Sequence, residues 1–242
     1  MKRLITALFI LLASVSFAQK KQTIHVERGS AFTINEDEPI WEELTDVANE
    51  GRWFYKLAQD ADHLYIAIRI SDELLQNYAV RDGINIQFMA DHKKQKDRVF
   101  VYPYPDKEVK RSLQQADFDP EKDYKSDLIG RSRGYYVTGF PSIVDGLLSF
   151  QNNYGLYAEA RMLNKQFYYT ARIAKSLIPI GADGFGIKLR INDNLSALLQ
   201  AANKKGAGSQ TVIQGLQVEK GQDKSKKKAT TVLFLQAVLG KE

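Results

Sequence analysis

Apolar and polar residues alternate with a period of two along much of the chain. Between residues 64 and 70 every second position is leucine or isoleucine, whereas Tyr65 and Arg69 lie between them. A helix would scatter these aliphatic side chains because it repeats every 3.6 residues. The pattern therefore predicts a β-strand with one face in the core and one face toward solvent. We expect this strand to end at Ser71 and Asp72, with Asp72 bonding backbone N–H groups of the turn that follows; the alternative for Asp72 is a metal or ligand contact.

The same alternation predicts several further strands. Long candidates lie at residues 84–89, 156–162, 167–173 and 185–191, and shorter ones at residues 23–26, 53–59, 98–103 and 231–238. Asn164 and Lys165 separate two of them and predict a hairpin. One buried and one solvated face per strand is typical of antiparallel sheets. The chain is therefore expected to be all-β, an antiparallel β-sandwich or jelly roll with minor short helices, one around Trp41 and one at residues 194–203.

The N-terminus has the layout of a signal peptide. Lys2 and Arg3 precede an almost wholly apolar run at residues 4–15, and small residues follow up to Ala18. Cleavage near Ala18 would give an exported protein, periplasmic or secreted. The alternative is a membrane anchor, but the apolar run is short for a bilayer. The remaining residues 19–242 are expected to form one domain with no transmembrane segment.

The absence of cysteine from the sequence excludes structural disulfides and lipid attachment through an N-terminal cysteine. The formal net charge is +5, and part of the excess lies in the lysine-rich residues 220–228. We interpret this run as a solvated loop, and no nucleic-acid motif accompanies it, so no nucleic-acid partner is expected.

Two segments interrupt the regular spacing of strands, at about residues 103–146 and 204–228, and are expected to be long loops. The first carries many aromatic residues, which disordered loops usually lack. Tyrosine rings suit the C–H faces of sugars, and arginines add charge-assisted hydrogen bonds. The candidate ligand-binding residues are Tyr102, Tyr104, Tyr124, Arg131, Arg133, Tyr135 and Tyr136. The alternative is that these aromatics form a small core that pins the loop to the sandwich.

A second candidate surface is the polar face of the predicted sheet. It would gather Tyr65, Arg69, Tyr157, Arg161, Tyr168, Arg172, Lys188 and Arg190. Such a face could bind acidic polymers, or it could be an ordinary solvated sheet face.

The order of features resembles the family 9 carbohydrate-binding-module-like domains, within the DOMON-like group of β-sandwiches. The matching features are Asp37-Glu38 before Trp41, the Leu64-Tyr65 strand that ends at Asp72, a strand after Gly83, and a late strand ending near Asn192-Asp193. The resemblance implies that Trp41 is a structural residue packed under the sandwich. Sugar-binding members clamp a terminal sugar between two tryptophans, and neither Trp41 nor Trp53 maps onto that clamp, so sugar binding is not inherited by the match.

Other chemistries have weaker support. Nucleophilic catalysis finds no motif, and no pair of carboxylates is singled out for glycoside hydrolysis, so no enzyme is expected. Calcium is considered for the acidic residues Asp117, Asp119, Glu121, Asp123 and Asp127, but lysines lie among them and a solvated loop is favoured. Some DOMON-group relatives carry haem on a Met and a His, for which the choices here would be Met89 or Met162 with His63 or His92. No cofactor is expected.

These observations favour an exported, non-catalytic carbohydrate-binding module. The competing class is a structural or protein-interaction module of the cell envelope without a small ligand, and a haem-binding domain is the weaker third. A concave aromatic pocket would favour sugar, and a large exposed patch would favour a protein partner.

Overall fold

The computed structural model describes residues 22–35, 39–89, 96–106, 108–109, 123–192 and 230–240. The expected signal peptide, the predicted helix at residues 194–203 and the predicted loop at residues 204–228 lie outside these ranges. Among the described residues there is no helix both long enough and apolar enough to cross a membrane.

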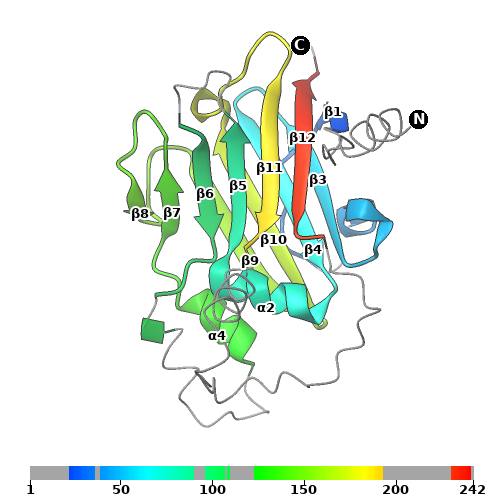
Figure 1. Cartoon of the computed structure of the whole chain (residues 1–242), viewed down its shortest axis with the longest axis vertical. Helices are drawn as coiled ribbons and strands as arrows, with labels where there is room; N and C mark the ends of the chain where they lie inside the picture. Colours follow the sequence, from blue (N-terminus) through cyan, green and yellow to red (C-terminus); the bar gives the residue numbers. More distant parts are fainter. Residues whose placement is uncertain are drawn as a thin grey trace, which may run out of the picture.

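The strands form two facing layers that are joined through the first strand (Figure 1). One layer runs β8 (Gly146–Leu148), β7 (Tyr135–Thr138), β6 (Arg98–Tyr102), β5 (Ile84–Met89), β11 (Phe185–Ile191) and β12 (Val232–Leu239). The other runs β3 (Trp53–Gln59), β4 (His63–Ile70), β10 (Gln166–Ala174) and β9 (Leu156–Leu163), with β2 (Thr45–Asp46) beside β3. The all-β sandwich predicted from the sequence is confirmed.

Strand β1 (Gln22–Arg28) belongs to both layers. Its first residues pair in parallel with β12, and Glu27 and Arg28 pair in parallel with β3. The other strand pairs are antiparallel. The prediction of a purely antiparallel sandwich is therefore wrong for β1, which makes the sheet mixed and closes one side of the sandwich.

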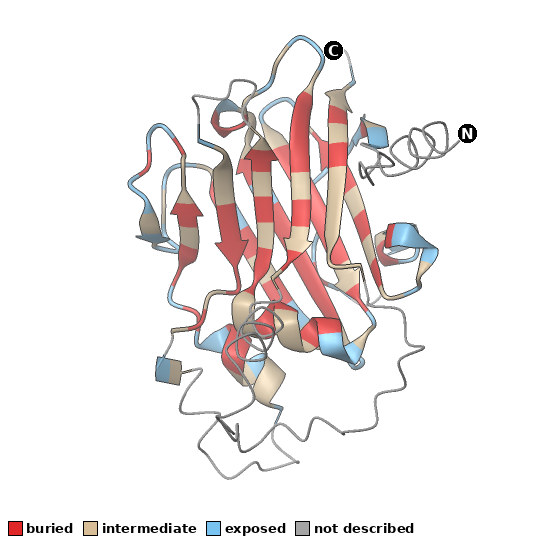
Figure 2. Cartoon of the chain, in the orientation of Figure 1, coloured by how far each residue is buried: buried red, intermediate tan, exposed pale blue. Residues whose placement is uncertain are grey.

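The core lies between the layers and is built from the predicted apolar faces. The four aliphatic residues of β4, at alternate positions from Leu64 to Ile70, are fully buried. Facing them are the alternate residues of β5 and β11, from Ile84 to Phe88 and from Phe185 to Ile191. Figure 2 shows this alternation as buried bands across the strands. The two-residue period of the sequence is thus what places each strand in its layer.

The outer face of β4 is not the solvated face that the alternation predicts. Tyr65 is 5% exposed and Ala67 is fully buried. A second apolar cluster covers part of this face and includes Ile34, Trp41, Leu44, Ala67 and Tyr168. The covering segment contains the short helix η1 (Pro39–Trp41), which confirms the predicted turn of helix. The ring of Trp41 meets the edge of Tyr168 at 4.9 Å between centroids, so the structural role implied for Trp41 is confirmed.

Two helices lie at one end of the sandwich (Figure 1). Helix α2 (Glu73–Asp82) follows β4 directly, and the side chain of Asp72 accepts a hydrogen bond from the Leu75 N–H at 3.0 Å. The predicted bond from Asp72 to backbone N–H is confirmed, but it caps a helix where a turn was expected. Helix α4 (Tyr124–Gly130) and β7 lie within residues 103–146, so the prediction of one long loop is wrong there.

Two single-turn helices complete the described elements. One is η2 (Val47–Asn49) after β2, and the other is η3 (Lys175–Leu177), which continues directly from β10. The backbone N–H of Lys175 donates to the Asp62 carbonyl at 2.8 Å. Helix η3 is thereby held against the turn between β3 and β4.

Candidate functional site

Two of the seven predicted ligand-binding residues belong to the core. Tyr135 is 1% exposed and Tyr102 is 7% exposed. Their rings meet each other edge to face, with 5.5 Å between centroids, and the ring of Phe150 packs against both. Burial raises the pKa of both phenols. Other aromatic rings enclose Tyr102 and Tyr135. The prediction that they contact a ligand is therefore wrong, and they have the alternative role of packing the core.

Tyr124 joins the two helices at the end of the sandwich. It is half-buried on α4 and packs against the core. Its hydroxyl hydrogen-bonds the Asn77 side-chain oxygen on α2. Tyr124 therefore holds α4 against α2, and its ring is not presented to a ligand in the way that the sequence analysis expected.

Tyr104 and Tyr136 do come together, on the outer surface of the sandwich. Their rings are stacked, with 5.0 Å between centroids and 24° between planes. Tyr136 faces outward because it alternates on β7 with the buried residues Tyr135 and Val137. Both Tyr104 and Tyr136 are partly exposed. This pair keeps the character of the predicted aromatic site.

The position of Tyr104 depends on a break in strand alternation. Phe100 and Tyr102 on β6 face the core, so simple alternation would turn Tyr104 inward as well. Pro103 interrupts the ladder between Tyr102 and Tyr104, because proline has no N–H to donate. Beyond it, the Tyr104 N–H donates to the Ser132 hydroxyl at 3.0 Å. The segment is thereby held against the start of β7 with the Tyr104 ring on Tyr136.

Charged residues lie beside the stacked tyrosines. The Arg133 Nε lies 3.1 Å from an Asp106 oxygen, and the Arg133 side chain is 74% exposed. Burial, followed by the nearby Tyr136 and Asp106, raises the pKa of Tyr104. Leu147 on β8 lies directly opposite Tyr136 and is half exposed. We call the group Tyr104, Asp106, Arg133, Tyr136 and Leu147 the tyrosine platform.

Arg131 is directed elsewhere. Its Nε bonds Asp127 on α4 at 3.0 Å, an ion pair one helical turn apart. Of the seven predicted residues, the structure thus brings Tyr104, Arg133 and Tyr136 together and assigns the other four to core packing or helix contacts.

The second predicted surface is divided between the two layers. Lys188 and Arg190 lie on β11, whereas the other six residues lie on β4, β9 and β10. The prediction that these eight residues gather on a single polar sheet face is therefore wrong. Tyr168 is buried under the segment that carries Trp41, and Tyr65 is buried with its ring meeting that of Phe32 edge to face, 6.4 Å between centroids.

What stays exposed of this surface lies along β9 and β10. The Arg172 guanidinium is 5.6 Å from the centre of the Tyr157 ring, and Arg161 pairs with Glu159 at 2.6 Å. Arg69 lies over Phe54 at 4.6 Å. These contacts are compatible with an ordinary solvated face as well as with a weak polar binding strip.

The acidic residues considered for calcium have other roles where they are described. Asp123 caps α4 through the N–H groups of Lys125 and Ser126, and Asp127 pairs with Arg131. Asp117, Asp119 and Glu121 lie outside the described residues. Within the described ranges no group of three or more His, Cys, Asp or Glu residues could hold a metal ion.

The residues considered for haem are dispersed. His63 lies beside Asp60, with 3.5 Å between Nδ1 and the carboxylate, and its ring stacks on Tyr65. Met162 packs against the core, Met89 lies against Gly186, and His92 is outside the described residues. His63, Met89 and Met162 therefore each make separate packing or polar contacts.

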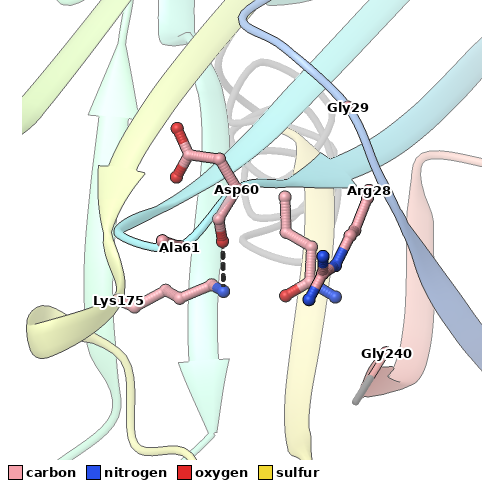
Figure 3. A pocket seen from close by; sticks show the side chains of 7 residues that line it. Arg28, Gly29, Asp60, Ala61, Lys175 and Gly240 are labelled. Atoms are coloured by element: carbon pink, nitrogen blue, oxygen red, sulfur yellow. Dashed lines mark hydrogen bonds between the residues drawn. The ribbon is translucent and has the colours of Figure 1, made fainter. Parts of the chain in front are cut away.

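The structure also contains a cavity that the sequence analysis did not find. It has a volume of about 280 Å³ and is lined by residues from the end of β1, the β3–β4 turn, η3 and the C-terminal end of β12 (Figure 3). Arg28, Asp60 and Lys175 are among its walls. These residues are far apart in the sequence, so no local motif announces the cavity.

Comparisons with known proteins give little similarity. No protein-family model matches the chain, and no curated protein matches it. Two solved structures of a family 9 carbohydrate binding module from Caldicellulosiruptor kristjanssonii are similar, one in complex with glucose and one with cellotriose. Each is 15% identical with a TM-score of 0.36, covering 72% of this chain and 81% or 80% of the other. That is the family which the sequence resembles.

Proposed function

We propose that the chain is an exported, non-catalytic carbohydrate-binding module whose ligand lies on the tyrosine platform. The observation that carries the proposal is the outward, stacked pair of Tyr104 and Tyr136 beside Arg133. Aromatic faces stack on the C–H faces of sugar rings, and a guanidinium donates hydrogen bonds to hydroxyls or to an acidic group. The platform offers both on one surface.

Binding is favoured over hydrolysis by the chemistry of the platform. Cleavage of a glycosidic bond generally needs two carboxylates that flank the scissile bond. The tyrosine platform, as defined, contains one carboxylate, Asp106, and Arg133 is paired with it. A paired carboxylate is poorly suited to act as a general acid, because a neighbouring positive charge favours its ionised form. Export is supported by the basic and apolar pattern of residues 2–18.

A second candidate function is protein binding in the cell envelope. The segment around β8 exposes several apolar side chains, with Val144 91%, Leu147 53%, Phe150 42% and Tyr154 44% exposed. Strand β8 is also the last strand of its layer, and such edges can pair with a strand from a partner. The protein-binding surface would include Leu147, which also belongs to the tyrosine platform. A protein partner is expected to cover all of the exposed apolar side chains around β8.

The test is a glycan array with the purified chain, with and without calcium, followed by titration of each hit. Tyr136→Ala is expected to weaken binding about tenfold, as loss of a stacking ring would. Tyr154→Ala, which removes an exposed ring outside the platform, is the matched control and should leave the affinity unchanged. Thermal unfolding of each variant checks that the fold is intact.

Each other outcome points away from the platform. A hit that is insensitive to Tyr136→Ala but lost in Tyr157→Ala would move the site to the β9–β10 face. A blank array with folded protein would contradict sugar binding and leave the β8 segment as the surface to test with protein partners.

A further inference from the structure

The cavity at the β3–β4 turn lies at the end of β4 opposite α2, and two cationic side chains enter it. Arg28 is the last residue of β1, and Lys175 begins η3. Figure 3 shows both side chains entering the cavity from opposite walls. The cavity volume is about 280 Å³, which is room for a small polar group and a short body attached to it.

The guanidinium of Arg28 has no acidic partner in the described part of the chain, where no aspartate or glutamate forms an ion pair with it. The Lys175 ammonium donates to the main-chain carbonyl of Asp60, which carries no formal charge. Two cations that face one cavity repel each other unless an anion lies between them.

Asp60 lines the same cavity, but its carboxylate is committed elsewhere. It accepts hydrogen bonds from the Tyr65 hydroxyl and from the N–H groups of Asp62 and His63, at 2.8 and 2.6 Å for the latter two. These bonds, that of Tyr65 first, hold the pKa of Asp60 near 2. Figure 3 shows the carboxylate directed away from the Lys175 ammonium. Asp60 therefore shapes the turn and contributes only its more distant charge to the cavity.

Gln59 holds the wall between the two cations through its side chain and its backbone. Its buried side-chain amide donates to the Val26 carbonyl at 2.9 Å, and the Gly29 N–H donates to the Gln59 main-chain carbonyl at 2.9 Å. These bonds link β1 to β3 at the point where Arg28 leaves the sheet. The position of Arg28 is thus set by the strand pairing, so the cavity is formed before any ligand arrives.

We infer that this cavity is a binding site for the oxyanion group of a small ligand, a carboxylate, phosphate or sulfate held between Arg28 and Lys175. A guanidinium and an ammonium are the side chains that proteins use for such groups. A neighbouring cavity of about 230 Å³ shares Arg28 and Gly29 and gives space for the rest of a larger ligand.

This site is independent of the tyrosine platform. The two sites share no residue. In the strand order, β7 and β8 of the platform stand at one edge of their layer, whereas β12 and β1, which lead into the cavity, stand at the other end of that layer with β6, β5 and β11 between them. Failure of one proposal would therefore leave the other standing.

The test is isothermal titration of the full purified chain at low ionic strength with three probes: sulfate, phosphate and glucuronate. Arg28→Gln and Lys175→Gln are each expected to weaken binding by about tenfold or more, as loss of a charge-assisted hydrogen bond would. Arg161→Gln, an equal charge change on β9, is the matched control and should change the affinity little. Asp60→Asn should tighten binding slightly, because it removes the more distant negative charge that Asp60 contributes to the cavity.

The probes also separate the possible sources. Glucuronate binding alone would identify a carboxylate site, and sulfate or phosphate binding alone a tetrahedral oxyanion site. Arg28→Lys keeps the charge and should keep part of the affinity, which guards against a folding defect in Arg28→Gln. The inference is overturned if none of the three probes binds at millimolar concentration, or if Arg161→Gln weakens binding as much as Arg28→Gln. Tyr136→Ala should leave all three affinities unchanged.

Discussion

Tyr135→Phe should destabilise the protein by loosening the side of the sandwich opposite β1. The Tyr135 hydroxyl donates to the Ala158 carbonyl at 3.2 Å and accepts from the Ala158 N–H at the same distance. Tyr135 belongs to β7 in one layer, and Ala158 lies on β9, the outermost strand of the other. One phenol oxygen thus satisfies both backbone groups of Ala158 and links the two layers.

The expected magnitude follows from what the substitution leaves behind. Phenylalanine keeps the ring but leaves one N–H and one C=O of Ala158 unpaired in a buried place. Each unsatisfied buried group costs about 1–3 kcal/mol, and bonds of this length belong to the weaker end of that range. We expect a loss of about 2 kcal/mol in the free energy of unfolding, or roughly 4–8 °C in Tm for a domain of this size.

Tyr169→Phe is the matched comparison. Tyr169 is fully buried, its ring lies 6.4 Å from that of Tyr102, and its hydroxyl has no hydrogen-bond partner among the described residues. Removing that hydroxyl should leave Tm unchanged or raise it, because it removes a buried polar group that makes no bond. Calorimetry and urea unfolding of both variants at pH 7 measure the difference. Equal losses in the two variants, or no loss in Tyr135→Phe, would refute the reasoning.

Two further predictions concern the ends of β4. Asp72→Ala removes the N-cap of α2 and should lower the free energy of unfolding by about 1 kcal/mol, measured by urea unfolding, whereas Asp72→Asn should retain most of the stability. The pKa of Asp60 is lowered to about 2, first by the Tyr65 hydroxyl, and the pKa of Tyr65 is raised to about 12, first by burial and then by Asp60. The contribution of Asp60 to the free energy of unfolding should therefore be complete above about pH 4 and be lost as the pH falls from about 4 to 2. The contribution of Tyr65 to the free energy of unfolding should be lost as the pH rises from about 10 to 12. Asp60→Asn should flatten the acid limb of a stability-against-pH curve; an unchanged acid limb would contradict this assignment.

The strands could be predicted from the sequence because alternation is a local property. The expected strand at residues 53–59 coincides with β3, and the hairpin at Asn164 and Lys165 is present with both residues at positive φ. Helix α2 could not be predicted in the same way, because its burial does not follow side-chain polarity. Leu74 is 49% exposed, whereas Gln76 is 2% exposed.

Gln76 is buried because distant carbonyl groups accept its amide hydrogens. It donates to the Ile70 carbonyl at 3.0 Å and to the Lys165 carbonyl at 2.9 Å, and its own oxygen accepts from Lys125 at 2.7 Å. These partners come from β4, the β9–β10 hairpin and α4. Tertiary contacts of this kind decide the burial of a polar residue and leave no trace in the local pattern.

The candidate sites also combine features that follow from the local sequence pattern with features that depend on tertiary contacts. The pair of Tyr135 and Tyr136 could have been sorted by alternation once β7 was known to be a strand, since one of two neighbours must face inward. Because both tyrosines were expected to lie in a loop, both were predicted to be ligand residues. The oxyanion cavity depends on β1, η3 and the C-terminal end of β12 meeting at the β3–β4 turn, and only the folded topology brings them together.

The double pairing of β1 also sets the order in which the protein can be completed. Its partner β12 begins at Val232, so the first and last of the described strands must meet before either layer has its full set of neighbours. Contacts between such distant segments close the largest loop in the chain and slow folding. Until β12 has been synthesised, β11 and β1 each keep an open edge, and open edges of this kind favour aggregation. Residues 232–239 therefore complete the pairing of a strand that was made more than 200 residues earlier.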